Sequence, residues 1–462
     1  MKLKPEFIKK LEIIAGHDWV LTGAGIAEDY AKDEMAIVRG IPDVLVLACE
    51  AAQIIETVRL CNEYLVPLTV RGSGTGLCGG AVAVNGGVLL DLTRMNRIIE
   101  LDEDNLCVKV EPGVLLMELT EFVQSHGLFY PPDPGEKTAT IAGNISTNAG
   151  GMRAVKYGVT RDYVRELEIV TGSGEVMTLG GKVVKNSSGY ALKDLIIGSE
   201  GTLGIILSAT LKLVPLPEFS VSLLLPYDNM SKAIETVPVL LRSKTSPTAV
   251  EFFERNILLY AEDYLGKKFP DTKSDAYLLL TYDGQTENEV EREYSQAAEL
   301  CIACGAKDAY IVDTDERKDS VWKARGAFLE AIKASTEELD ECDVVVPRSK
   351  VADYILYSRE VERLLGVRIS SFGHAGDGNL HIYVCRDEIP EADYRIKLEQ
   401  AFNMLYEKAG EFGGKISGEH GIGFAKKEWL RRQTPEPVIS IMREIKSTFD
   451  RNKILNPGKV ID

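Results

Sequence analysis

Short apolar runs separated by glycine fill the chain from about residue 44 onward. Residues 44–48 are continuously apolar and predict a strand, while residues 51–64 carry apolar side chains at helical spacing and predict a helix. Residues 67–71 predict the next strand, so this stretch is typical of a strand–helix–strand unit. The elements expected after it are strands at 87–92, 97–101 and 106–111 and a helix at 114–126.

The pattern changes at a proline pair, Pro215 and Pro217. Before this pair, residues 165–179 predict a hairpin whose turn is 171–174. After it, strand-like and helix-like segments alternate up to about residue 412, which is typical of an α+β domain built on an antiparallel sheet. The strands are expected near 220–225, 247–253, 275–282, 307–312, 343–346, 367–373 and 379–384. The first forty residues predict an amphipathic helical lead-in, and the last fifty are expected to be helical.

Composition and charge narrow the class of protein. A chain of 462 residues exceeds what one hydrophobic core usually organises, so more than one domain is expected. The net charge of −17 argues against nucleic acid or an anionic membrane as the main partner. No apolar run approaches the roughly 18 residues that span a bilayer, so no integral membrane segment is expected. The basic start leads into no long apolar stretch, so no secretory signal is expected either.

Eight cysteines are scattered along the chain, which favours reduced thiols in a cytoplasmic protein over a disulfide framework. Cys301 and Cys304 alone form a Cys-x-x-Cys pair, at the end of a helix-like stretch. Half-buried helix cysteines are the favoured interpretation, with a redox or metal pair as the alternative.

A glycine loop at residues 71–80, Arg-Gly-Ser-Gly-Thr-Gly-Leu-Cys-Gly-Gly, directly follows a predicted strand. Glycines let several backbone N–H groups approach one anion, and Ser73 and Thr75 add hydroxyl donors. The loop lacks the lysine of a phosphate-binding Walker loop and leads into no helix of the Rossmann type. Taken alone it is equally compatible with a flexible turn that binds nothing.

Residues 131–151 are rich in proline, glycine, threonine and asparagine and are too long for a simple turn, which predicts a functional loop. Small and hydroxyl residues at 138–151 suit close approach of the backbone to a large ligand. Further blocks follow at 157–158, 162–163, 185–190 and 198–206.

Three of the five histidines fall in two glycine-rich motifs. His374 and His381 flank Ala-Gly-Asp-Gly-Asn-Leu, and Glu419 and His420 lie in Ser-Gly-Glu-His-Gly-Ile-Gly, residues 417–423. Imidazole and carboxylate groups in open loops suit a divalent metal ion with Lewis-acid chemistry. Hydrogen-bonded turn histidines are the alternative. Arg325 could clamp a carboxylate in a bidentate fork, although by sequence alone a solvated helix arginine is favoured.

These blocks, in this order, resemble the FAD-binding domain of the vanillyl-alcohol oxidase / p-cresol methylhydroxylase superfamily. From about residue 42 to the C-terminus the chain is most similar to FAD-linked D-2-hydroxy-acid dehydrogenases of the glycolate oxidase D subunit and D-lactate dehydrogenase type. The resemblance implies an α+β fold, with a two-subdomain FAD-binding domain and a C-terminal α+β substrate (cap) domain with an antiparallel sheet. It implies an FAD-binding domain at 41–217, a cap domain at 218–412, and a segment at 413–462 that returns to the flavin site.

The resemblance also implies which residues bind FAD. The first loop would hold the pyrophosphate, residues 132–151 would wrap the dinucleotide, and residues 200–206 would lie by the adenine. The first loop has no histidine, so noncovalent FAD is expected, with attachment at Cys78 or elsewhere left open. The implied cofactor-binding residues are Arg71, Gly72, Ser73, Gly74, Thr75, Gly76, Gly79, Pro132, Asp133, Thr140, Gly143, Asn144, Ser146, Thr147, Gly150, Gly151, Tyr157, Gly158, Asp162, Glu200, Gly204, Ile205, Ile206 and Asn456.

In that family the two histidine motifs supply metal ligands, which map onto His374, His381 and Glu419. His420 is then the implied general base and Arg325 the implied carboxylate clamp. Zinc, manganese or ferrous iron would fit these ligands. The D-2-hydroxyglutarate dehydrogenases have a lysine where this chain has Glu341, and an asparagine where it has Tyr383. Without that lysine, no cation is expected there to hold a second carboxylate of the substrate. A monocarboxylate substrate is therefore favoured, with D-lactate first and glycolate next.

The implied activity is oxidation of a small D-2-hydroxy acid, with electrons leaving reduced FAD for a separate acceptor. The resemblance favours a partner protein, such as electron-transfer flavoprotein or an iron–sulfur subunit, and hence a hetero-oligomer. A cytochrome or a quinone is the other kind of acceptor that the family uses. Two rival functions remain, which are a non-catalytic flavoprotein scaffold in an electron-transfer complex and a metallohydrolase built on the histidine cluster.

Overall fold

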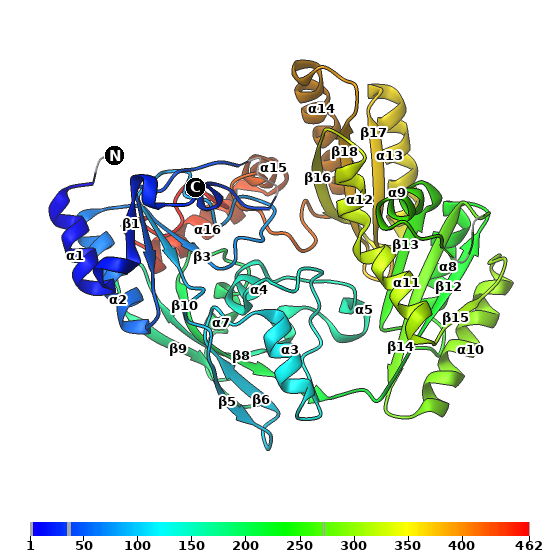
Figure 1. Cartoon of the computed structure of the whole chain (residues 1–462), viewed down its shortest axis with the longest axis horizontal. Coiled ribbons are helices and arrows are strands. Elements are labelled where there is room, and N and C mark those ends of the chain that lie inside the picture. Colours follow the sequence, from blue (N-terminus) through cyan, green and yellow to red (C-terminus); the bar gives the residue numbers. More distant parts are fainter. Residues whose placement is uncertain (1–2, 35–37, 270, 272, 462) are drawn as a thin grey trace. The chain divides into compact units, whose positions relative to one another are not determined.

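The computed structural model of the chain describes residues 3–34, 38–269, 271 and 273–461. The chain divides into two compact units (Figure 1). Unit 1 consists of Met1–Ala149, Val159–Pro215 and Glu419–Asp462, and unit 2 of Gly150–Gly158 and Leu216–Gly418.

Unit 1 begins with a strand–helix–strand fold, as the apolar runs predict. Strands β2 (Val44–Leu47) and β3 (Leu68–Arg71) both pair in parallel with β4 (Val88–Asp91), and α2 (Ala51–Tyr64) connects them. Parallel strands need such a crossover, since a tight turn cannot join them. The apolar face of α2 packs into a core with the sheet and with α1 (Pro5–Ala15).

The prediction of a helical lead-in was wrong beyond Ala15. The short strand β1 (Val20–Thr22) pairs antiparallel with β2 and extends the sheet to the order β1-β2-β4-β3. The 3-10 turns η1 (His17–Trp19), η2 (Gly23–Gly25) and η3 (Glu28–Ala31) surround it. Gly16 and Gly23 interrupt the helical pattern here, which a count of apolar positions does not register.

The second sheet of unit 1 is antiparallel, in the order β5-β6-β10-β8-β9. Its strands are β5 (Ile98–Asp102), β6 (Cys107–Val110), β10 (Ile205–Lys212), β8 (Val164–Val170) and β9 (Val176–Gly180). The predicted hairpin at 165–179 is confirmed as β8 and β9. The remaining elements of unit 1 are α3 (Leu116–Gln124), β7 (Leu128–Phe129), α4 (Ile141–Thr147), α6 (Thr160–Tyr163), α7 (Leu192–Ile196), β11 (Val214–Pro215), α15 (Lys427–Gln433) and α16 (Glu436–Phe449).

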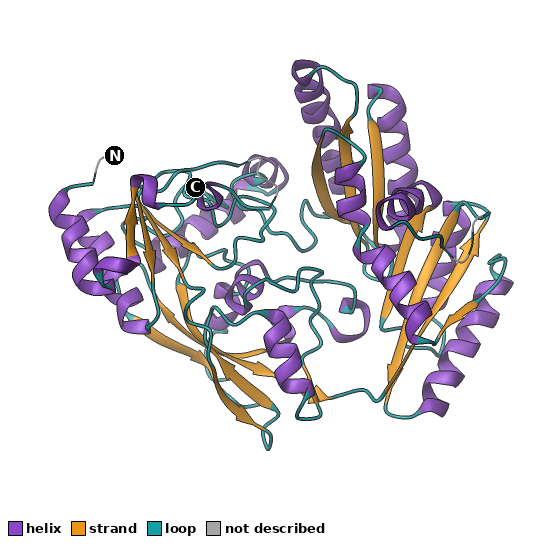
Figure 2. Ribbon diagram, viewed as in Figure 1, coloured by secondary structure: helices purple, strands orange, loops and turns teal. Residues whose placement is uncertain are grey.

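Unit 2 is built on one antiparallel sheet, whose strands are orange in Figure 2. The order is β15 (Tyr310–Val312), β12 (Phe219–Tyr227), β14 (Ala276–Gly284), β13 (Ala249–Glu254), β17 (Arg368–His374), β18 (Asn379–Arg386) and β16 (Glu338–Val345). All the strands predicted after the proline pair are present. Strand β16 begins five residues before the predicted start of 343, so Glu341 lies inside it.

The helices of unit 2 form two groups. One group is α8 (Met230–Leu241), α10 (Glu287–Ala303), α13 (Val351–Leu365) and α14 (Glu391–Glu411), and the other is α9 (Arg255–Leu265), α11 (Asp315–Gly326) and α12 (Phe328–Ala334). The second group covers the face of the sheet that holds Phe253 and Phe372, because Phe328 of α12 packs edge-on against both rings. The short helix α5 (Ala154–Tyr157) contacts β13.

Within the described residues, no helix combines the length and the apolar character needed to cross a membrane.

Candidate active site and cofactor-binding segments

Polar side chains gather on one face of the unit 2 sheet, at neighbouring strands β13, β17, β18 and β16. Directly opposite residues of paired strands share a face. The register places Glu251 opposite His374, Phe372 opposite His381, and Asp343 opposite His381. Because side chains alternate along a strand, Glu341 and Tyr383 lie on this face too. The group of Glu251, Glu341, Asp343, His374 and His381 is called the histidine face below.

The two histidines of this face are buried, each 5% exposed, with ring centroids 5.3 Å apart. His374 donates its Nδ1–H to Glu251 Oε1 at 2.6 Å, and His381 donates its Nδ1–H to Glu341 Oε1 at 2.9 Å. An ionised carboxylate can accept but not donate, so each ring carries its proton on Nδ1. Nε2 is then the atom that each ring offers to a metal ion.

This arrangement fits a divalent metal ion. Metal-binding histidines characteristically donate their second ring nitrogen to a carboxylate, which fixes the ring and makes the ligand nitrogen more basic. The ligand atoms of His374 and His381 lie within 4.8 Å of one another, close enough to share one ion. Two imidazoles with carboxylates are ligands that suit zinc, manganese or ferrous iron.

Arg325 of α11 reaches the same face and is 9% exposed. Its Nε and Nη2 donate to Glu251 Oε2 at 2.8 and 2.5 Å, and its guanidinium lies 4.7 Å from the centre of the Phe372 ring. Burial would raise the pKa of Glu251, but His374 and Arg325 beside it hold that pKa below its ordinary value. The structure therefore joins predicted residues Arg325 and His374 through Glu251.

Asp343, at the edge of the histidine face, fixes the segment that leads to Glu419. Its side chain is fully buried, and it accepts hydrogen bonds from Asn379 Nδ2 at 2.6 Å, Ser417 Oγ at 2.9 Å and the Gly418 amide at 3.1 Å. Glu419 and His420 come next in the chain and belong to unit 1. Their side chains are 12% and 15% exposed, with His420 Nε2 lying 3.7 Å from Glu419 Oε1.

In unit 1 the glycine segments that are far apart in sequence come together. The first loop follows β3, and a Cβ on Gly72 would lie 2.1 Å from Thr140 Oγ1. Thr140 caps α4, which carries Gly143, Asn144 and Ser146. The Glu200 amide donates to the Ser146 carbonyl at 2.8 Å, so the third block lies beside the second.

Asn456 joins these blocks at the C-terminal end of unit 1. Its Nδ2 donates to the carbonyls of Gly80 at 3.1 Å and Glu200 at 2.6 Å, and its Oδ1 accepts from the Val70 amide at 3.2 Å. Lys459 is fully buried and donates to the Gly80 carbonyl at 2.8 Å. Burial lowers the pKa of Lys459 to about 7, against the opposing pull of Glu200 and Asp33.

Glu200 has a structural role within unit 1 that the resemblance does not imply. Its two carboxylate oxygens accept from the amides of Ile422 at 2.7 Å and Gly423 at 2.8 Å. Burial raises its pKa, which these amides and the nearby Lys459 partly counteract. Glu200 thus holds the end of the 417–423 motif within unit 1.

The residues of unit 1 fit a dinucleotide. Asn144 is 5% exposed, and no described residue accepts a hydrogen bond from its Nδ2. A buried donor without an acceptor is costly, and a ligand bound along α4 would supply one. Gly76 of the first loop has open space where a Cβ would stand, so the backbone is accessible there.

Several predicted cofactor residues use their side chains within the protein. Arg71 donates to the carbonyls of Lys32 at 2.8 Å and Asp29 at 3.1 Å, which ties down the N-terminal segment. Asp133 pairs with Lys137, and Asp162 accepts from the Val159 amide at 2.8 Å.

The other predicted cofactor residues lie as follows. Gly150, Gly151, Tyr157 and Gly158 belong to unit 2, where Tyr157 donates to Asp283 at 3.0 Å. Pro132, Ile205 and Ile206 are buried in unit 1, and Ser73, Thr75 and Thr147 are half-buried there. A Cβ added to Gly74, Gly79 or Gly204 would contact the side chain of Arg71, Val38 or Ile169, respectively.

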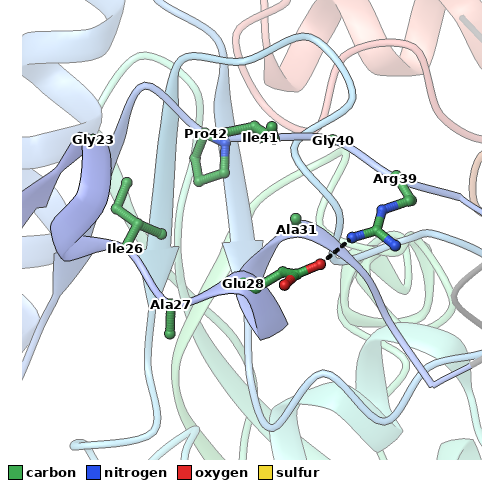
Figure 3. A pocket seen from close by; sticks show the side chains of 9 residues that line it. All are labelled: Gly23, Ile26, Ala27, Glu28, Ala31, Arg39, Gly40, Ile41 and Pro42. Carbon is green, nitrogen blue, oxygen red and sulfur yellow. Dashed lines mark hydrogen bonds and ion pairs between the residues drawn. The ribbon is translucent and has the colours of Figure 1, made fainter.

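A pocket of about 560 Å³ lies in the N-terminal segment of unit 1 (Figure 3). It is mainly apolar, and an ion pair of 2.8 Å joins Arg39 and Glu28 at its margin. None of the predicted site residues lines it.

Cys301 and Cys304 are free thiols at the end of α10. Cys304 is half-buried, as the favoured interpretation expects, whereas Cys301 is fully buried. Burial raises the pKa of the Cys301 thiol to about 12, which disfavours the thiolate that redox or metal chemistry needs.

Unit 1 contains two sheets and the glycine segments that come together there, and unit 2 contains one antiparallel sheet, an arrangement that suits an FAD-binding domain with a second α+β domain. The FAD binding domain family matches residues 42–180, and the C-terminal domain of FAD linked oxidases matches residues 216–460. The chain therefore belongs to the FAD-linked oxidase family and is an FAD-linked oxidoreductase.

Its relatives include a D-lactate dehydrogenase of Anaerostipes hadrus, 48% identical over 99% of this chain and 98% of that protein. A glycolate oxidase subunit GlcD of Bacillus subtilis is 40% identical over 93% of this chain and 91% of its own length. Among solved structures, p-cresol methylhydroxylase with substrate bound matches with a TM-score of 0.81 at 18% identity, covering 99% of this chain and 96% of that one. The last match shows the fold alone.

Glu251 is a site residue that the sequence interpretation missed. The signal for it is an acidic residue inside the otherwise apolar run 249–253, Ala-Val-Glu-Phe-Phe. A charge within a buried strand needs a partner, so such a residue marks a polar contact in the core. Its partners, however, come from two distant parts of the chain.

Proposed function

We propose that this protein oxidises a small D-2-hydroxy acid to the 2-oxo acid in the cytoplasm, with D-lactate first and glycolate next. The observation that carries the proposal is the histidine face, where Arg325 and the carboxylate-backed His374 share Glu251. A guanidinium that can bind a carboxylate thus lies beside imidazoles that can bind a metal ion. A 2-hydroxy acid carries a carboxylate and a hydroxyl on adjacent carbons, which suit these two groups. The relatives named for D-lactate and glycolate support this substrate class.

Arg325 binds the substrate carboxylate in this proposal. The Nε–H and one Nη2–H of Arg325 already donate to Glu251. The other N–H groups of the guanidinium are assigned to the substrate carboxylate. The planar guanidinium of an arginine matches the two oxygens of a carboxylate better than the ammonium of a lysine does. Glu341 places a negative charge on the same face, so a second carboxylate on the substrate would be repelled there. The site is therefore assigned to monocarboxylates.

His374, His381 and Glu419 are the proposed ligands of the metal ion. A metal ion held there would lower the pKa of the substrate hydroxyl, and FAD held by unit 1 would accept the hydride from C2. His420, next to Glu419 in the chain, is the proposed base that takes the hydroxyl proton. Electrons then leave for a partner protein, for which electron-transfer flavoprotein or an iron–sulfur subunit is proposed.

The test is the visible spectrum of the purified protein under anaerobic conditions, before and after a hydroxy acid is added. D-Lactate should bleach the oxidised flavin bands, glycolate should do so more slowly, and L-lactate should leave them unchanged. D-2-Hydroxyglutarate serves as the dicarboxylate control and should reduce the flavin poorly.

The same spectrum separates the rival functions. A scaffold flavoprotein would be yellow, and no hydroxy acid would reduce it. A metallohydrolase would be colourless. Bleaching by D-2-hydroxyglutarate in preference to D-lactate would overturn the assignment to monocarboxylates.

A further inference from the structure

Glu251 contacts both the proposed carboxylate clamp Arg325 and the proposed metal ligand His374 in unit 2. Its side chain is fully buried in the middle of β13, between Val250 and Phe252 in sequence. The two oxygens have different partners, since Oε2 receives both N–H groups of Arg325 and Oε1 receives the Nδ1–H of His374. The carboxylate therefore forms a bridge between the two side chains.

Each contact restricts a different functional group. The paired bonds to Arg325 fix the plane of the guanidinium, which also stacks at 4.7 Å on Phe372. The bond to His374 fixes the ring so that its Nε2 is the atom available to a metal ion. Neither oxygen can be replaced by an amide nitrogen, because both partners are donors.

We propose that Glu251 is a positioning residue that couples binding of the substrate carboxylate to binding of the metal ion. The inference rests on the proposed function, in which Arg325 and His374 have these two roles. Glu251 holds both groups at once, so its loss weakens the two binding events together. A residue that only stabilised unit 2 would lower the stability and leave both affinities of the folded protein intact.

The variant Glu251→Gln tests the coupling, with Glu262→Gln as the matched control. Glu262 is also a buried glutamate of unit 2, and the side chains with which it pairs, Arg255 and Lys268, do not belong to the histidine face. In Glu251→Gln, affinity for Zn²⁺ or Mn²⁺ measured by titration should fall about 10–100-fold. The KM for D-lactate should rise about tenfold or more, since charge-assisted bonds to Arg325 are lost. Glu262→Gln should retain wild-type values of both.

Excess metal ion gives a second readout. It should restore metal occupancy in Glu251→Gln. The KM for D-lactate should stay raised, because Arg325 still lacks the carboxylate that holds its guanidinium in place. Glu251→Asp keeps the charge that Arg325 needs in the core but is one methylene shorter, so it cannot reach both partners. It should fold if Glu251→Gln does not, and it should show the same paired losses.

A folded Glu251→Gln or Glu251→Asp with wild-type metal affinity and wild-type KM would overturn the inference. Loss of one property without the other would also overturn it, since coupling requires both. Failure of the proposed function looks different, because D-lactate would then not reduce even the wild-type flavin. The metal titrations of the Glu251 and Glu262 variants would still be interpretable in that case.

Discussion

Ionisable side chains in the interior of this protein each have several partners that fix their role. Glu200 accepts from two backbone amides, Glu251 from two side chains, and Lys459 donates to the Gly80 carbonyl. A buried charge persists when such partners replace water. The roles of these residues are therefore determined by contacts between distant parts of the chain.

Replacing His420 by alanine should slow reduction of the flavin by D-lactate about 100- to 10,000-fold, the usual contribution of a general base. The FAD content should stay at the wild-type level. Stopped-flow absorbance under anaerobic conditions measures the rate. The exposed His126 provides the control, since His126→Ala should behave as the wild type. Near-normal reduction in His420→Ala would remove this residue from the mechanism.

The lowered pKa of Lys459 leads to a prediction of how the stability of unit 1 depends on pH. Its pKa is about 7 in the folded protein, below the value of about 10.4 for an unfolded chain. Between these values the unfolded chain binds more protons, so the contribution of Lys459 to the free energy of unfolding rises with pH from 7 to about 10. Lys459→Met should remove this rise, whereas the exposed Lys185→Met should keep it. Urea unfolding of the FAD-free protein at several pH values checks the difference between the variants.

At the scale of elements, the sequence predicts most of the helices and strands, because each needs only a local pattern. The strand–helix–strand unit at 44–71 and the strands of unit 2 are within a few residues of their predicted bounds. Helix α4 was missed, because Thr140 caps a helix made of small residues that give no apolar period. The histidine face was only half predicted. His374 and His381 stand out in their glycine motif, but Glu251 joins them through strand register, which no local pattern contains.

The first glycine loop offers a matched pair of substitutions. Gly74 has φ +77°, and a Cβ there would lie 2.1 Å from the guanidinium of Arg71, whereas a Cβ on Gly76 would meet open space. Gly74→Ala should destabilise the FAD-free protein by about 1–3 kcal/mol, or about 2–4 °C in Tm per kcal/mol. Gly76→Ala should leave that Tm unchanged and weaken FAD binding, because the new methyl occupies space assigned to the cofactor. Calorimetry without FAD and a fluorescence titration with FAD separate the two effects. Equal Tm values for the two variants would contradict the argument.

At the scale of the whole molecule, both units are assembled from separated segments. Unit 1 combines three parts of the chain, and residues 150–158 belong to unit 2 although the flanking residues do not. Such assignments follow from contacts between distant residues, so the local apolar pattern does not contain them, and only the family resemblance implies that residues 413–462 return to the flavin site. Leu455 illustrates the point, since it forms a parallel bridge with Leu68 and lies in the core of unit 1.

Leu455→Asp should therefore unfold unit 1. The substitution puts an unpaired charge where the side chain is 1% exposed, a change that costs several kcal/mol. The protein should be purified without FAD, and calorimetry should show loss of the transition that FAD stabilises in the wild type. Arg451→Asp, at an exposed position of the same segment, should retain FAD. A yellow Leu455→Asp protein of normal Tm would refute this view of the core.

The position of residues 419–462 in unit 1 has a consequence for synthesis on the ribosome. All of unit 2 has been translated before these residues exist, so it can fold while unit 1 still lacks Ile454 and Leu455 in its core. At about 5–20 residues per second, the first 149 residues wait on the order of tens of seconds for their last partners. Nascent chains arrested after residue 418 should thus resist protease in unit 2 and be cleaved in unit 1. The N-terminal part of this enzyme is made first and completed last, so its apolar core residues stay exposed longest during synthesis.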